Sequence, residues 1–514
     1  MANSPTPTEQ SETPDEQSHS LRHGIGLILG PVVFLTILLV PTPDGMSVEG
    51  QRVAAVAALM AIWWISEAIP IPITSLLPIV LFPKLRVMSS QESTAPYADH
   101  LIYLFMGGFV IALAMQRWNL HRRIALVIIH VIGFSPSRLV LGFMVATAVL
   151  SAFVSNTATA VMMMPIGMAI ISQATDEISA LKLDVPQKSI DAFGTNLMLG
   201  IAYAASIGGI ATIIGTPPNT VLASYLSNTY NYEISFMKWM AVGVPLVLIF
   251  IPLSWIWLTR FAYPMKGLAL PNSDDIINEE IKLLGPMSKG ERYTLIIFLI
   301  TAVCWIMRSW VAKWFPITDM VKDSTIAIAG AIALFLIPVD FKRRIFVMNW
   351  EWAVKLPWSV LVLFGGGLAL AEGFKVSGLT AWTVDQVSFL EQMPILIIIL
   401  GLAALVTFLT EMTSNTATTT LLMPVLAGVA IGLGQSPLLL LAPAAMSASC
   451  AFMLPVATPP NAIVFGSGKV TIPEMVKGGF ALNVMGIFII TALVYLILVP
   501  VFGVVLNELP SWAQ

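Results

Sequence analysis

Long apolar runs, divided by short polar links, are the dominant pattern along the chain. Runs such as Gly24–Val40, Tyr293–Met307, Ser324–Pro338 and Asn483–Val505 approach the ~20 residues that a helix needs to cross a bilayer. The runs are continuous and do not alternate with polar residues, which favours helices over a transmembrane β-barrel. The pattern therefore predicts an all-α polytopic membrane protein with about 11 spans.

Composition points the same way. Of the 514 residues, 57% are hydrophobic and 11% are charged. A soluble domain carries about 25% charged residues, so this chain has too few charges to cover a surface that faces water. Membrane lipid is its expected surrounding. The two cysteines, Cys304 and Cys450, lie in apolar runs and are expected to fill the core rather than to form a disulfide or bind a metal.

Polar segments mark the expected domain boundaries. Residues 1–23 are predicted to be a disordered N-terminal tail, because this end is rich in Ser, Thr, Pro and Glu. A second polar stretch, residues 270–292, is predicted to be a cytoplasmic loop between two halves. The first half, together with a preceding helix, then spans residues 24–269, and the second half spans residues 293–514.

Sequence motifs repeat between these two halves. The pentapeptide Ser-Asn-Thr-Ala-Thr occurs at Ser155–Thr159 and again at Ser414–Thr418. Two further pairs of segments follow the same order: Leu104–Gly108 with Leu363–Gly367, and Gly215–Asn219 with Ala457–Asn461. Internal repeats of this kind are typical of secondary transporters, whose binding sites lie at the repeat interface and are formed by broken helices.

Each repeated motif interrupts an apolar run. The arm before the first Ser-Asn-Thr tip, Leu139–Val154, rises only ~24 Å as a helix, which is short for a full crossing. We therefore predict re-entrant hairpins over residues 139–172 and 395–432. The Thr-Pro-Pro-Asn segments predict broken helices over residues 194–227 and 438–468, because proline lacks the N–H that continues a helix. Broken backbone at membrane depth is tolerated where it lines a cavity or is buried in protein.

Basic residues indicate the orientation. If the N-terminus is cytoplasmic, most Lys and Arg residues fall inside, as the positive-inside rule requires. The C-terminus then lies outside, and the two hairpins enter from opposite sides, as expected of an inverted repeat. The clusters that fall inside are Arg117/Arg122/Arg123, Arg260/Lys266/Lys282/Lys289/Arg292 and Lys342/Arg343/Arg344.

The motif regions contain almost no fixed charge. Residues 139–181, 192–237 and 376–468 include no Lys or Arg, and the only acid close to a tip is Glu411, which is expected to pair with a helix end rather than to bind an ion. Neutral oxygens suit a hard cation such as Na⁺, and helix N-termini suit an anion. An anionic substrate without a protein cation beside it needs its charge offset, and at least two co-bound Na⁺ per divalent substrate would do this.

Ser and Thr in membrane helices often only hydrogen-bond neighbouring helices. The duplication of the tips, each followed by Thr-Pro-Pro-Asn, favours a binding site over that structural interpretation. Ser151 lies four residues before Ser155, and Thr410 lies four before Ser414, so each tip can gather two hydroxyls and an asparagine on one face.

Trp63-Trp64-Ile65-Ser66-Glu67-Ala68-Ile69-Pro70, the two Ser-Asn-Thr tips and the two Thr-Pro-Pro-Asn segments together resemble the divalent-anion/sodium symporter family, which includes dicarboxylate transporters. The resemblance implies a homodimer in which a scaffold holds the dimer and a transport domain moves as an elevator. It implies sodium sites formed by Ser151, Ser155, Asn156 and Gly215, and by Thr410, Ser414, Asn415 and Ala457. It implies substrate contacts from Ser155, Asn156, Thr157, Thr216, Pro217, Ser414, Asn415, Thr416, Thr458 and Pro459.

The expected function is Na⁺-coupled symport of C4 dicarboxylates such as succinate, malate or fumarate, in a bacterial inner (plasma) membrane. The alternatives are a Na⁺-independent dicarboxylate exchanger (2-oxoglutarate/malate or succinate antiport), then a sulfate carrier, then a channel. An enzyme is not expected, because no Ser/His, Asp/Asp or metal-ligand constellation is evident. No nucleic-acid partner is expected.

Overall fold

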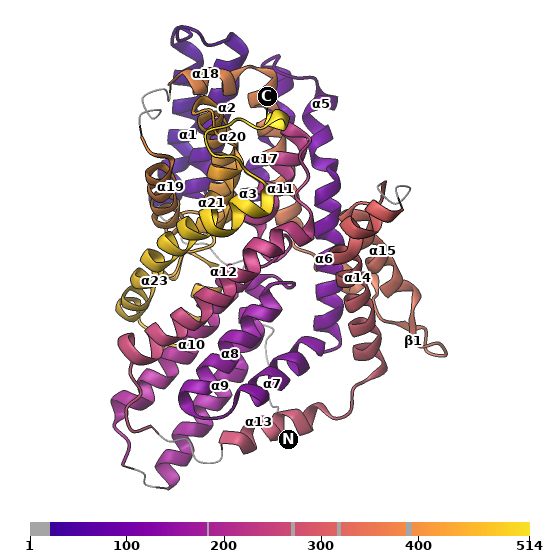
Figure 1. Cartoon of the computed structure of the whole chain (residues 1–514), viewed down its shortest axis with the longest axis vertical. Coiled ribbons are helices and arrows are strands. Elements are labelled where there is room, and N and C mark those ends of the chain that lie inside the picture. The colour runs from indigo at the N-terminus through magenta and orange to yellow at the C-terminus, as the bar shows by residue number, and fades with distance from the viewer. Residues whose placement is uncertain (1–20, 182–183, 269–272, 316–319, 387–392, 514) are drawn as a thin grey trace, which may run out of the picture.

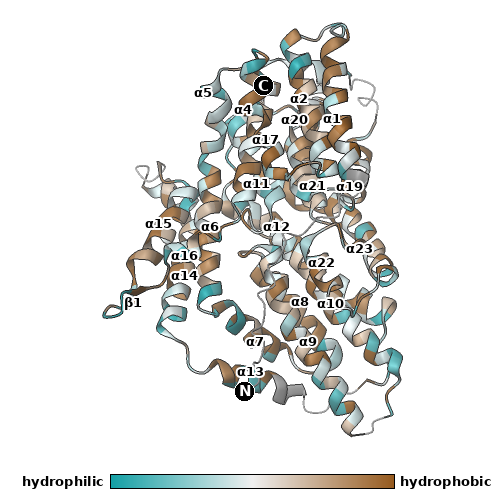
Figure 2. Ribbon diagram, turned by 180° about the vertical axis from the view of Figure 1, so that it is seen from behind, coloured by the Kyte–Doolittle hydropathy of each residue, from teal (hydrophilic) through white to brown (hydrophobic). Residues whose placement is uncertain are grey.

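The computed structural model describes residues 21–181, 184–268, 273–315, 320–386 and 393–513, and most of them are helical. Within these ranges, nine helices are long and apolar enough to cross a membrane, and six shorter apolar helices accompany them. Figure 2 shows apolar residues along most of the helices and hydrophilic ones mainly at their ends and in the connections. The prediction of a polytopic helical membrane protein is confirmed.

The first half of the chain forms twelve α-helices and two shorter helical turns. Those before the first tip are α1 (Leu21–Leu39), α2 (Val48–Ser66), α3 (Ile71–Thr74), α4 (Leu77–Lys84), α5 (Ser90–Thr94), η1 (Ala95–Ala98), α6 (His100–Arg117) and α7 (Leu120–Ile132). Those around and after it are α8 (Pro136–Ser151), α9 (Asn156–Ala180), α10 (Gln187–Gly209), α11 (Pro217–Tyr230), α12 (Phe236–Ile256) and the π-helical turn η2 (Trp257–Ala262).

The second half repeats much of this order. Its first elements are α13 (Ser273–Leu284), α14 (Lys289–Trp314), α15 (Asp323–Leu336), the strands β1 (Pro338–Asp340) and β2 (Ile345–Phe346), α16 (Trp350–Ala353), α17 (Trp358–Val376) and α18 (Leu379–Gln386). Its remaining elements are α19 (Ile395–Thr410), α20 (Asn415–Gly432), α21 (Leu438–Ala448), α22 (Pro459–Phe465), α23 (Ile472–Leu493), η5 (Val494–Leu498), α24 (Val499–Phe502) and η6 (Ser511–Ala513). The two strands pair antiparallel, with Pro338 opposite Phe346.

Several segments differ from the predicted boundaries. The first hairpin, predicted over residues 139–172, corresponds to α8 and α9, which extend from Pro136 to Ala180. Residues 21–23, assigned to the tail, belong to α1, and residues 1–20 lie outside the described ranges. The segment 270–292, predicted as a loop, contains α13 and the first turn of α14. The apolar side chain of Ile277 is fully buried, and α13 packs against α7. A short amphipathic helix forms here because its apolar face finds a partner.

Most of the described helices fall into two groups. The frame helices, α1–α6 and α14–α17, pack mainly on one another. The motif helices, α8–α12 and α19–α23, carry the repeated tips and breaks. Within the second group, each half packs a helix against the tip helix of the other half: α11 packs against α20, and α22 packs against α9. In Figure 1, α8 and α9 occupy the lower part of the molecule, and α19 and α20 occupy the upper part.

The glycine-rich segments of α6 and α17 allow close helix packing. A Cβ at Gly107 would lie 2.6 Å from the backbone of Ala327 in α15. A Cβ at Gly367 would lie 2.1 Å from the Thr420 side chain in α20, where a frame helix meets a motif helix. The repeated glycines therefore permit backbone approach.

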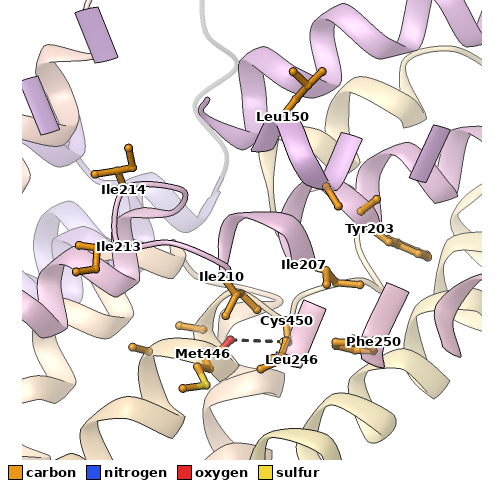
Figure 3. Close-up of a cluster of buried hydrophobic side chains, with 14 of the residues drawn as sticks. Leu150, Tyr203, Ile207, Ile210, Ile213, Ile214, Leu246, Phe250, Met446 and Cys450 are labelled. Carbon is orange, nitrogen blue, oxygen red and sulfur yellow. Dashed lines mark hydrogen bonds between the residues drawn. The ribbon is translucent and has the colours of Figure 1, made fainter. Parts of the chain in front are cut away.

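A buried apolar cluster holds the motif helices together around the two breaks. Figure 3 shows Cys450 and Met446 of the second half at the level of Phe250 of α12, with Tyr203 and Ile207 of α10 above them. The thiol of Cys450 donates to the Met446 carbonyl at 3.5 Å. The broken backbone is thus embedded in apolar side chains from both halves.

Candidate functional site

The two Ser-Asn-Thr tips and the two Thr-Pro-Pro-Asn breaks all begin helices. Ser155 and Ser414 are the N-cap residues of α9 and α20, and their hydroxyls accept from the backbone N–H three residues later. Thr216 and Thr458 are the extended residues before α11 and α22, and prolines occupy the first helical positions. Ser and Thr at the N-cap and Pro in the first turn are preferred residues for a helix start, so local chemistry explains all four helix starts.

These four helix starts line one cavity of about 980 Å³. The first tip and first break contribute Ser155, Asn156, Thr157, Gly215, Thr216 and Pro217. The second tip and second break contribute Ser414, Asn415, Thr416, Ala457, Thr458 and Pro459. The structure therefore brings twelve of the fourteen predicted site residues to one cavity. The other two, Ser151 and Thr410, are fully buried behind the tips.

Oxygen atoms converge behind the first tip. The Ser151 hydroxyl lies 2.7 Å from the Asn156 side-chain oxygen and 2.6 Å from the Ala205 carbonyl. If the Asn156 amide is turned over, its nitrogen lies 3.1 Å from the Ala205 carbonyl and 3.2 Å from the Gly215 carbonyl. The inward-pointing atom of Asn156 is thus surrounded by three oxygens in either orientation. Such a group of neutral oxygens can be satisfied by an amide donor or by a hard cation.

The second tip has the same arrangement. The Thr410 hydroxyl lies 2.5 Å from the Asn415 side-chain oxygen and 3.1 Å from the Ala448 carbonyl. Ser151 and Thr410 occupy equivalent positions in the repeat, as do Asn156 and Asn415. Both halves therefore place a hydroxyl, an asparagine and a carbonyl from the broken helix together.

The first tip also needs glycine at two positions. A Cβ at Gly209 would lie 2.6 Å from the Asn156 side-chain oxygen and 3.1 Å from Thr216. A Cβ at Gly215 would lie 2.4 Å from the Gly209 carbonyl. Only a residue without a side chain lets the first break approach the tip this closely.

Buried asparagines tie both breaks. Asn219 donates to the carbonyls of Gly209 and Thr212, at 3.2 and 2.7 Å. Asn461 donates to the carbonyls of Ala451 and Leu454, at 3.1 and 3.0 Å. The final residue of each Thr-Pro-Pro-Asn motif therefore fixes the loop that precedes it.

Sequence reasoning missed two features of the site. The carbonyls of Ala205 and Ala448 face the tips, but a backbone atom has no residue-type signature. The cavity wall opposite the tips belongs to the frame helices and their links, and it carries the charged side chains Glu67 and Lys355. The absence of Lys and Arg noted for the motif regions therefore holds for the tips but not for the whole cavity.

Known proteins resemble this chain over nearly its whole length. A family model described as "Sodium:sulfate symporter transmembrane region" matches residues 22–504. The chain is 45% identical to the sodium-dependent dicarboxylate transporter SdcS of Staphylococcus saprophyticus over 96% of this chain and 95% of that protein. It is also 45% identical to SdcS of Staphylococcus aureus, over 94% of this chain and 93% of that protein.

One solved structure shows a related fold. The YdaH transporter of Alcanivorax borkumensis superposes with a TM-score of 0.53 at 14% identity, covering 78% of this chain and 85% of that one. At this identity the likeness concerns the fold alone.

Proposed function

The chain belongs to the sodium:sulfate symporter family, and from this premise we propose that it couples Na⁺ entry to uptake of a C4 dicarboxylate. The family is one of transporters, so the activity to be tested is transport rather than catalysis. The observation that carries the proposal is the single cavity on which two tips and two breaks converge, each of them a helix start without a Lys or Arg.

Helix starts account for the anionic substrate. The first N–H groups of a helix have no partner within it and carry partial positive charge. Helices α9, α11 and α20, with the shorter α22, all begin at the cavity. The hydroxyls and amides of Ser155, Asn156, Thr157, Ser414, Asn415 and Thr416, with Thr216, Pro217, Thr458 and Pro459 beside them, would bind the two carboxylates.

Oxygens behind the tips account for the cation. One Na⁺ would lie among Ser151, Ser155, Asn156 and Gly215, and a second among Thr410, Ser414, Asn415 and Ala457. The hydroxyl, asparagine and carbonyl oxygens gathered there support both sites. Two Na⁺ neutralise a dicarboxylate, and a third would make uptake respond to membrane voltage. We therefore propose at least two Na⁺ per substrate.

The mechanism that we propose is an elevator. The motif helices would move as one block against the frame helices of a homodimer, within a fold of about 11 spans, two re-entrant hairpins and an inverted repeat. The opposite placement of the two tip hairpins in Figure 1 supports this arrangement. The N-terminus would be cytoplasmic and the C-terminus outside, in a bacterial inner membrane.

The decisive experiment is uptake of labelled succinate into proteoliposomes. Uptake should require an inward Na⁺ gradient and should collapse when choline or K⁺ replaces Na⁺ at fixed pH and osmolarity. Undiminished uptake that internal dicarboxylate accelerates would instead establish an exchanger, and a preference for labelled sulfate would establish a sulfate carrier. Varying external Na⁺ at fixed succinate measures the cooperativity, which should exceed that of a single ion.

A further inference from the structure

The two breaks are not equivalent. Helix α10 continues to Gly209, whereas α21 ends at Ala448, three residues before the position that corresponds to Gly209 in the repeat. Beyond each helix end, two more N–H groups bond to carbonyls three residues earlier: those of Ile210 and Ala211 in the first half, and those of Ser449 and Cys450 in the second. The coiled backbone therefore still ends three positions earlier in the second half. The second break is therefore wider, and something other than the helix must satisfy its N–H groups.

A buried carboxylate satisfies them. Glu411, only 3% exposed, accepts the backbone N–H of Phe452 at 2.7 Å, that of Met453 at 2.9 Å and that of Leu454 at 3.1 Å. The side-chain amide of Asn483 in α23 also donates to it, at 2.7 Å. Four donors thus face one carboxylate, and the three backbone donors lie in the break between α21 and α22 rather than at a helix end, where Glu411 was expected to pair.

These bonds divert the chain from a helix and release a carbonyl. In a continued α-helix, the N–H of Phe452 would bond to the carbonyl of Ala448, four residues earlier. Glu411 takes that N–H instead, and the Ala448 carbonyl lies 3.1 Å from the Thr410 hydroxyl. The released oxygen therefore faces the pair of Thr410 and Asn415.

In the first half, the backbone and side-chain roles are exchanged: the tip contributes a backbone carbonyl and the break contributes a side-chain hydroxyl. The residue that corresponds to Glu411 is Ala152, which has no side-chain acceptor. Its carbonyl accepts from the hydroxyl of Thr212 on the break, so the tip supplies the acceptor in both halves, but only the second half uses a carboxylate.

We propose that Glu411 is a positioning residue for the second cation site: it holds residues 452–454 out of the helix and so presents the Ala448 carbonyl to the cation bound at Thr410 and Asn415. The inference rests on the proposed Na⁺ coupling. It implies that the second site, but not the first, depends on a buried carboxylate that does not itself touch the cation.

Glu411→Gln tests this with little change in shape. The amide keeps one acceptor oxygen but places an NH₂ group against backbone N–H donors, so at least one bond to Leu454 or Met453 is lost. Losing one or two hydrogen bonds to a charged group predicts a ten- to hundredfold rise in the Na⁺ concentration for half-maximal uptake. The cooperativity for Na⁺ should fall, while the succinate KM at saturating Na⁺ should change less than threefold.

Glu291→Gln is the matched control, because Glu291 is another buried carboxylate that accepts a backbone N–H but lies outside the cavity lining. It should leave the Na⁺ curve unchanged, although the loss of its ion pair with Arg123 should lower its melting temperature with and without Na⁺ alike. Asn483→Leu removes a single donor to Glu411 and should give an intermediate shift, which keeps the proposal testable if Glu411→Gln folds poorly. Each purified variant is also melted with and without Na⁺, and the Na⁺-induced rise in melting temperature should shrink only for the Glu411 and Asn483 variants.

The outcomes distinguish a failure of the proposed Na⁺-coupled transport from a failure of the positioning role of Glu411. If the wild-type protein takes up succinate without Na⁺, the proposed function fails and the inference falls with it. If wild-type uptake needs Na⁺ but Glu411→Gln keeps the wild-type Na⁺ curve, the proposed function stands and the positioning role is overturned. A lower melting temperature with an unchanged Na⁺ response would also overturn it, because it would show a structural role alone.

Discussion

The Thr410 hydroxyl lies 2.5 Å from the Asn415 side-chain oxygen, and the Ser151 hydroxyl lies 2.7 Å from that of Asn156. In both halves, a hydroxyl at the end of one hairpin arm meets an asparagine at the start of the other. The arms α8 and α19 end at these hydroxyl residues, and α9 and α20 begin at the asparagines. The pair therefore closes the tip of each hairpin and places its oxygens beside a broken helix.

The first prediction concerns variants that lack these amides. Asn156→Ala and Asn415→Ala each delete a proposed cation ligand and a donor to the substrate. A hydrogen bond to a charged group is worth about 1.5–3 kcal/mol, so each variant should lose roughly ten- to a hundredfold in apparent affinity for Na⁺ and succinate. Isothermal titration of the purified proteins measures both losses.

Asn228→Ala is the control, because Asn228 lies on α11 but its amide bonds only to the Ser224 carbonyl among the hydrogen bonds of the described residues. It should bind both ligands as the parent does. Parental binding by either tip variant would show that its tip serves only the fold.

The second prediction concerns close approach at the first break. Gly209→Ala adds a Cβ that would lie 2.6 Å from the Asn156 side-chain oxygen, so the asparagine must shift away from the oxygens around it. Na⁺-dependent uptake should fall at least tenfold at low Na⁺. Gly401→Ala on α19 is the matched control, since no atom of the described residues lies within 4 Å of its added Cβ. It should transport normally, and an equal loss in both variants would contradict the steric explanation.

Local chemistry made the motif positions predictable from the sequence. Ser or Thr before a helix and Pro in its first turn identify helix starts, and their repetition indicated that two tips and two breaks belong to one site. Helices α19 and α20 fall within the segment predicted as the second hairpin, residues 395–432. The cavity that joins the motifs follows from the repeat rather than from any single segment.

Tertiary contacts decided what the sequence could not. The carbonyls of Ala205 and Ala448 are backbone atoms, so nothing in residue type distinguishes them from their neighbours. Lys355 reaches the cavity through the packing of the frame helices, far along the chain from either tip. Helix α13 forms in a segment that reads as a polar loop, because α7 covers its apolar face.

The third prediction concerns the stability that the contact between α7 and α14 provides. Arg123 on α7 forms a 2.8 Å ion pair with Glu291 at the start of α14, and their side chains are 16% and 6% exposed. Removing one partner of a largely buried pair leaves the other charge uncompensated, so Arg123→Gln should lower the free energy of unfolding by about 3 kcal/mol. Thermal melting in detergent measures the loss.

The surface pair Arg343–Asp340 gives the comparison. Its atoms lie 3.8 Å apart, and its side chains are 80% and 42% exposed. Exposed pairs contribute about 0–1 kcal/mol, so Arg343→Gln should leave the melting temperature nearly unchanged. A similar melting temperature for both variants would show that the α7–α14 contact does not depend on its ion pair.

The last prediction concerns movement of the motif helices. Thr157 lines the cavity and its side chain is exposed, so Thr157→Cys presents a thiol to whichever side the cavity faces. The native Cys304 is exposed and is replaced first, whereas Cys450 is buried.

Under the elevator proposal, a membrane-impermeant thiol reagent should reach position 157 from the cytoplasmic side in one state and from the outside in the other, because the tip itself changes sides. Na⁺ with succinate should shift the balance between the two rates. Ser359→Cys on the frame wall of the same cavity is the control, and it should react from one side alone, since the frame does not move. If position 157 reacts from one side only in a variant proven to transport, the tip does not cross the membrane and the elevator is wrong.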